Sequence, residues 1–87
     1  KYVMPTVFMP NGDNLDDEFL IFTKDGYTIG KMWIYNRWGE LMYEGTDPWD
    51  GTYKSENAKQ GVYVVAAELI SDSGELTKIV GDVTLLR

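Results

Sequence analysis

Short apolar runs rich in β-branched and aromatic residues follow one another along the whole chain, and turn-forming residues separate them. The runs cover residues 3–9, 19–23, 31–36, 41–44, 62–70, 76–80 and 83–86. Such short runs favour strands, and no segment has the length and helical period that a βαβ unit would need. The pattern predicts an all-β fold, an immunoglobulin-like antiparallel β-sandwich of about seven short strands.

The middle of the chain has the pattern of a hairpin followed by a turn-rich segment. Residues 31–36 and 41–44 flank four residues that include a Gly, which is typical of a hairpin connection. Turn-forming residues then dominate positions 45–60. Within them we expect turns and one helical turn at 56–60.

The end of the chain predicts a second, longer hairpin. Asp72-Ser73-Gly74 turns the longest run, 62–70, back into 76–80 and then 83–86. Gly81 lies between the last two runs, where we expect a bulge or a bend.

Composition limits the functions that this fold could carry. The chain has 87 residues, which suits one domain with a modest core, because a domain of this size buries only about 60–65% of the surface that its unfolded chain exposes. Its net charge of −6 disfavours nucleic acid as a partner, since binding to phosphates relies on Lys and Arg. The sequence has no Cys and no His, so it lacks thiolate nucleophiles and the usual general base. We therefore expect no enzymatic activity.

The first acidic loop carries side-chain oxygens at the spacing of a metal loop. Asn11, Asp13 and Asp17 are the candidate ligands, with Asp16 or Glu18 assisting. Ca²⁺ takes six to eight oxygen ligands, and the spacing matches an EF-hand loop only in part. A turn without metal explains the same residues, because Asn-Gly and Asp stabilise turns through local hydrogen bonds. Calcium is therefore a hypothesis beside the simpler interpretation.

Two turns contain a Trp, at positions 38 and 49, and each side chain could belong to the core or to a binding surface. Arg37 can stack on Trp38, and Gly39 is expected to take a backbone angle that residues with a Cβ disfavour. Trp38 could form a docking surface or cover the core, and we favour the core because a small domain needs its aromatics there. Trp49 is expected to pack inward, with Asp50 accepting backbone hydrogen bonds.

Five segments resemble, in order, one family: the gliding-motility-associated C-terminal domain, the type B export signal of the Bacteroidetes type IX secretion system. The opening FMPNGDNLDDEF is similar to the family's F-T-P-N-G-D-G-x-N-D-x-F, with Asn14 in place of its second Gly. The other segments are NRWGE at 36–40, WDGT at 49–52, GVYV at 61–64 and GDVTLLR at 81–87. The resemblance covers nearly the whole chain.

This resemblance implies an address for export and no bond chemistry. Residues 1–87 would be a single C-terminal sorting domain, cut from the end of a larger secreted protein with cargo domains upstream of Lys1. The folded domain would be recognised by components of the type IX translocon and by a PorP/SprF-like outer-membrane protein. The expected destination is the cell surface or the medium, after passage through the periplasm and the outer membrane.

Two parts of the chain are predicted to dock the partner. They are the bend formed by Arg37, Trp38 and Gly39, and the terminal strand formed by Val83, Thr84, Leu85, Leu86 and Arg87. The terminal strand could lie at an edge of the sheet and be offered for strand addition, or it could pair in the ordinary way with 62–70, and both could hold together.

Two other functions fit parts of the sequence. A carbohydrate-binding or adhesive module would use an aromatic platform of Tyr35, Trp38, Trp49 and Tyr53. Alternation along the strands weakens it, because residues at mixed parity cannot all face one side. Pairs of acidic residues could run glycoside hydrolysis only beside a sugar cleft, and solvated turn carboxylates are the better interpretation in a domain this small.

Overall fold

The computed structural model describes residues 1–10, 12 and 17–87, and within them it contains nine strands and no helix. The strands are β1 (Tyr2–Val3), β2 (Val7–Phe8), β3 (Phe22–Thr23), β4 (Tyr27–Tyr35), β5 (Leu41–Gly45), β6 (Thr52–Tyr53), β7 (Glu56–Asn57), β8 (Gly61–Ser71) and β9 (Leu76–Leu85). The all-β prediction is confirmed, although the strands differ in number and length: five have only two residues each, whereas β4, β8 and β9 are longer than the runs that predicted them.

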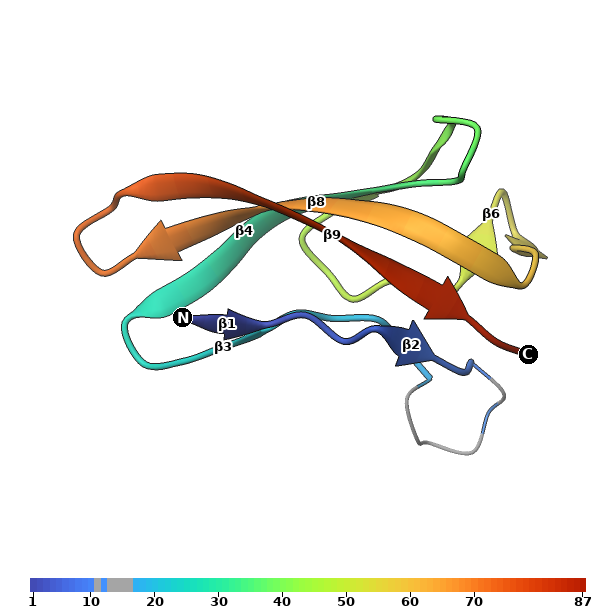
Figure 1. The fold of residues 1–87 in the computed structure, drawn as a ribbon, viewed down its shortest axis with the longest axis horizontal. Helices are drawn as coiled ribbons and strands as arrows, with labels where there is room; N and C mark the ends of the chain where they lie inside the picture. Colours follow the sequence, from blue (N-terminus) through green and yellow to red (C-terminus); the bar gives the residue numbers. More distant parts are fainter. Residues whose placement is uncertain (11, 13–16) are drawn as a thin grey trace.

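One five-stranded sheet, in the order β2-β9-β8-β4-β5, forms the main layer (Figure 1). Its centre is the β8–β9 hairpin, whose register runs without a break from Gly61 opposite Leu85 to Ile70 opposite Leu76. The neighbouring strands in this sheet are antiparallel except β2, which runs parallel to the end of β9. The first strands of the chain thus meet the last.

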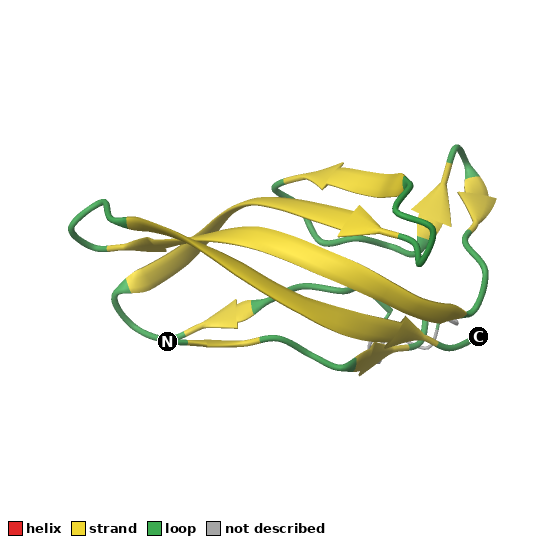
Figure 2. Ribbon diagram, turned by 45° about the horizontal axis from the view of Figure 1, so that its top comes forward, coloured by secondary structure: helices red, strands yellow, loops and turns green. Residues whose placement is uncertain are grey.

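A second, thinner layer lies against one face of this sheet. It consists of the β1–β3 pair and the segment that leads into β3, as Figures 1 and 2 show. The inward-facing residues of β8 alternate with outward-facing ones, so that Tyr63 and Val65 are buried whereas Val62 and Val64 are exposed. This period of two is the pattern of a sheet that is covered on one side.

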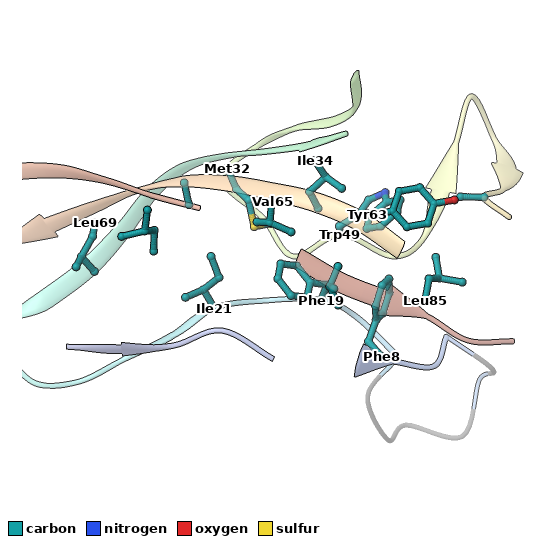
Figure 3. Close-up of a cluster of buried hydrophobic side chains, with 14 residues drawn as sticks. Phe8, Phe19, Ile21, Met32, Ile34, Trp49, Tyr63, Val65, Leu69 and Leu85 are labelled. Carbon is teal, nitrogen blue, oxygen red and sulfur yellow. The ribbon is translucent and has the colours of Figure 1, made fainter. Parts of the chain in front are cut away.

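The core between the two layers is built around four aromatic rings (Figure 3). The ring of Trp49 lies 5.5 Å from that of Phe8 and 5.3 Å from that of Tyr63, measured between centroids. Phe19 also packs on Phe8, and its backbone forms a bridge with Trp49. The prediction that Trp49 packs inward is confirmed, because only 1% of its surface is exposed.

Several boundaries differ from the predictions. The run 3–9 is split into β1 and β2, and only Phe22–Thr23 of the run 19–23 is a strand. The helical turn predicted at 56–60 is wrong, because Glu56–Asn57 pairs with Thr52–Tyr53 in a small hairpin. Its two central residues, Lys54 and Ser55, have φ of 52° and 68°, which matches the tight turns that such hairpins use.

The bulge predicted at Gly81 is also wrong, because Gly81 sits opposite Val65 in an unbroken register. A Gly is needed at position 81 for another reason, because a Cβ there would collide with the sulfur of Met4. Gly81 therefore lets the segment between β1 and β2 cross close over β9.

Replacing Gly81 with Ala should destabilise the domain by about 1 kcal/mol, the low end of the range for overpacking, because the atom in the way belongs to the flexible Met4 side chain. The cost should fall when Met4 is also replaced by Ala, because the sulfur that the new Cβ would meet is then absent. Chemical denaturation of the two single variants and the double variant measures this coupling. An equal cost of Gly81→Ala with and without Met4 would contradict the assigned contact.

Candidate docking surface

The bend between β4 and β5 is held in one shape by Asn36. The Asn36 side-chain oxygen accepts hydrogen bonds from the backbone N–H groups of Trp38 and Glu40, each at 2.9 Å. Its amide nitrogen donates to the Glu40 carboxylate at 3.0 Å, and the backbone closes the turn between Gly39 and Asn36. Gly39 has a φ of 83°, as predicted. The sequence analysis missed the role of Asn36, although Asn at the start of a turn commonly bonds the backbone two residues on.

Trp38 points away from the core, and the prediction that it covers the core is wrong. Its side chain is 79% exposed. The Arg37 guanidinium lies 5.1 Å from the Trp38 ring centroid, which confirms the predicted stacking. The backbone of the bend directs the Trp38 side chain away from the sheet. Amino-acid composition alone does not indicate the direction in which this side chain points.

A cleft of about 500 Å³ separates this bend from the β6–β7 hairpin. Arg37, Trp38, Glu40 and Met42 line one side, and Tyr53 and residues 56–60 line the other. The Tyr53 hydroxyl donates to the Glu40 carboxylate at 3.2 Å and so links the two sides. In Figure 1, the bend, β6 and the C-terminus lie toward the same end of the molecule.

The floor of the cleft is formed by the start of β8, including Val62 and Tyr63. The Tyr63 hydroxyl donates to the backbone carbonyl of Lys59 at 2.5 Å. Burial raises the pKa of Tyr63, and the charge of Arg87 opposes that rise in part. Tyr63 thus stays neutral and ties the loop that follows β7 to the sheet.

The terminal strand is mostly structural. Val83 and Leu85 belong to the core, with 1% and 0% of their surfaces exposed. Thr84 is half-buried and donates its N–H to the carbonyl of Thr6 at 2.8 Å. The prediction that this segment lies at a sheet edge is wrong, because β9 lies between β8 and β2 there. The alternative, pairing with the 62–70 strand, is confirmed.

The last two residues divide between surface and structure. Leu86 is 37% exposed. Arg87 donates from Nε to the Ala58 carbonyl at 2.9 Å and from Nη2 to the Gly51 carbonyl at 2.6 Å. Its guanidinium thereby connects the end of the chain to the residues that flank the β6–β7 hairpin.

The metal hypothesis is only partly covered by the structure. Asn11 and Asp13 lie outside the described residues. Asp17 is described, and one of its carboxylate oxygens accepts the Gly12 N–H at 3.1 Å, as a turn without metal requires. Within the described part of the chain, no three acidic, His or Cys side chains gather as a metal site.

The aromatic platform of the carbohydrate hypothesis does not form as predicted. Trp49 is in the core and donates its indole N–H to the Thr52 carbonyl at 3.0 Å. The Asp50 carboxylate accepts the N–H of Thr52, which confirms the expected role of Asp50. Trp38 and Tyr53 do share the cleft.

No helix among the described residues is long and apolar enough to cross a membrane.

The chain matches the family described as the CHU_C type IX secretion signal domain over residues 2–84. No match was found among curated proteins or among solved structures. The match spans almost the entire fold described above, from β1 into β9. It confirms the family resemblance drawn from the five sequence segments. The chain therefore belongs to the CHU_C family of type IX secretion signal domains.

Proposed function

We propose that this domain directs an upstream cargo through the type IX secretion system to the cell surface, and that a partner protein reads it through the bend at Arg37, Trp38 and Gly39. The partner is a PorP/SprF-like outer-membrane protein acting with components of the translocon. The role is recognition between proteins, without bond chemistry.

The exposure of Trp38 carries this proposal. A Trp side chain that is 79% exposed contributes almost nothing to the core of a domain that has few large residues to spare. Trp and Arg are the residue types most enriched at the energetic centres of protein interfaces. Here they sit side by side on a bend that hydrogen bonds already hold in place. A pre-ordered bend loses little conformational entropy on binding.

The cleft extends the surface around the bend. Met42, Tyr53 and Val62 give it an apolar interior, and Glu40 with Glu56 adds acidic groups at the sides. In Figure 1, Lys1 lies well away from this end of the molecule. A cargo domain that precedes Lys1 would therefore leave the bend and the cleft accessible.

Replacing Trp38 with Ala should reduce export about ten-fold or more, the effect expected from losing roughly 1.4 kcal/mol of binding free energy. The experiment fuses residues 1–87 behind a signal peptide and a fluorescent reporter in a gliding Bacteroidetes host, with and without a co-expressed PorP/SprF-like partner. Surface fluorescence measures export. Stability should change by less than about 0.5 kcal/mol, because the side chain is exposed.

Phe22→Ala is the matched control, since Phe22 is another large aromatic that is 55% exposed but lies on β3. It should be exported like the unchanged domain. Equal export of the Trp38 and control variants would reject the bend as the docking surface. Reporter retained in the periplasm for every fusion would reject the sorting function itself. In that case Trp38 and Tyr53 would be tested for glycan binding by quenching of Trp fluorescence.

A further inference from the structure

We propose that the open edge of β9, residues 76–82, pairs with the same edge of a second copy of this domain. This inference is independent of the proposed export function. The resulting dimer would join two five-stranded sheets into one continuous sheet.

The backbone of β9 has hydrogen-bonding groups left over on one side. Thr84 and Leu86 donate their N–H groups away from β8, to the carbonyls of Thr6 and Phe8. Alternate residues of a strand direct these groups the same way, and the register with β8 is unbroken. The N–H and C=O groups of Leu76, Lys78, Val80 and Asp82 therefore point to the same side, where no described strand pairs with them.

Two apolar side chains on this edge are exposed, and contact with a second copy would bury them. Val80 is 68% exposed and Leu76 is 52% exposed. Natural edge strands discourage pairing with a Pro, a bulge or charged side chains, Lys above all. Residues 76–82 contain no Pro and no bulge, and their two charges, Lys78 and Asp82, have opposite signs. The opposite edge strand, β5, differs because its pairing with β4 contains a register shift next to Ile34.

A two-fold axis at Ile79 gives a self-complementary antiparallel register. Leu76 then lies opposite Asp82 of the second copy, and Lys78 lies opposite Val80 of the second copy. All these residues carry outward-directed N–H and C=O groups, so each opposed pair can exchange two hydrogen bonds. Lys78 is also diagonal to Asp82 of the second copy, within reach of a long side chain. Each Lys78 thus has an opposite charge on one diagonal, Asp82 of the second copy, and a like charge on the other, Lys78 of the second copy. The charges favour the pairing when each Lys78 side chain turns toward Asp82.

Neighbouring registers are poorer. A shift by two residues in one direction places Lys78 opposite Lys78 of the second copy, which brings like charges together. A shift in the other direction places Leu76 opposite Thr84, whose N–H is already bonded to Thr6. The position of β2 thus limits the pairing to the segment that ends at Asp82.

One existing contact must change for the charge pairing to form. The Lys78 ammonium lies 4.2 Å from the centroid of the Trp33 ring, on the outer face of the sheet. Lys31 also lies over this ring, at 5.7 Å. Lys78 can therefore turn toward the edge while Trp33 keeps a cation above it.

The test measures the molar mass of the purified 1–87 domain by light scattering and sedimentation equilibrium, from micromolar to millimolar concentration. A monomer–dimer equilibrium is expected. Lys78→Asp and Asp82→Lys should each raise the dissociation constant about ten-fold or more, and the double variant should restore it, because the charge pair is exchanged. Thermal unfolding of each variant verifies that it is folded.

Val62→Lys is the control for the dimer equilibrium alone, because Val62 is exposed on the outer face of β8, in the floor of the cleft and away from the open edge of β9. It should leave the dissociation constant unchanged. Hydrogen exchange should slow at the amides of Lys78, Val80 and Asp82 as concentration rises. A monomer at every concentration would overturn the proposal, and so would a dimer that only Val62→Lys disrupts, since its sheets would pack face to face. Edge amides protected only by another protein would assign the edge to that protein and overturn pairing between copies.

Discussion

Replacing Trp49 with Ala is expected to lower the free energy of unfolding by about 3–5 kcal/mol, the range measured for removing large aromatic residues from cores. A domain of this length has a total stability of about 4–13 kcal/mol at the usual values per residue. The substitution therefore removes a large share of the total stability, and export should fall with the folded fraction.

The size of this effect follows from the position of Trp49. Its ring fills the space between Phe8 and Tyr63, and its backbone exchanges two hydrogen bonds with Phe19, at 2.8 and 2.9 Å. The side chain thus packs on two strands of the main sheet, while its backbone holds the segment that leads into β3. The Ala variant would leave a cavity that residues of two layers cannot close without moving.

Chemical denaturation followed by far-UV circular dichroism measures the Trp49 effect, with Trp38→Ala as the control. The two substitutions remove the same atoms, yet one side chain is 1% exposed and the other 79%. Similar losses of stability in both variants would contradict the assigned burial. A stable Trp49 variant with reduced export would mean that this residue contacts the partner.

Deleting residues 83–87 should also abolish export, and it should do so by unfolding the domain. The deletion removes Val83 and Leu85 from the core, together with the pairing between β9 and β2. It also removes the two hydrogen bonds that the Arg87 side chain donates to the β6–β7 region. Burial of these two aliphatic side chains alone is worth about 3–6 kcal/mol, which is a large share of the whole stability.

The truncated domain should therefore show no cooperative thermal transition and rapid proteolysis. Leu86→Ala is the control for this deletion. Leu86 is exposed, so its replacement leaves the core intact and the variant should fold like the unchanged domain. If the truncated domain melts cooperatively near the temperature of the intact one, then the terminal segment is dispensable for folding, and loss of export would place a recognition signal there.

Local turn chemistry made several features predictable from the sequence. The hairpin around residues 36–40 and the positive φ of Gly39 follow from residues that lie next to one another. The inward position of Trp49 follows from the need of a small domain for core aromatics. The same argument failed for Trp38, because the direction of a side chain on a bend depends on the hydrogen bonds of Asn36.

Contacts between distant parts of the chain were not predictable in the same way. The parallel pairing of β2 with the end of β9 joins residues near the two ends of the sequence, and no local pattern indicates it. For this reason the sequence analysis placed the open edge at residues 83–87 instead of 76–82. The run 3–9 was split for a related reason: after Val3 the chain leaves β3 and crosses Gly81 to reach β9.

The pairing of β2 with β9 also determines when the domain can finish folding. Strands that meet across nearly the whole chain close slowly, because the entropy of a long loop must be overcome before their contacts stabilise anything. During synthesis, or during passage through a membrane pore, Phe8 emerges early and must wait for Leu85. A receptor that requires the closed fold would therefore bind the domain only after nearly all of it had crossed, and this strand pair would then report that passage is complete.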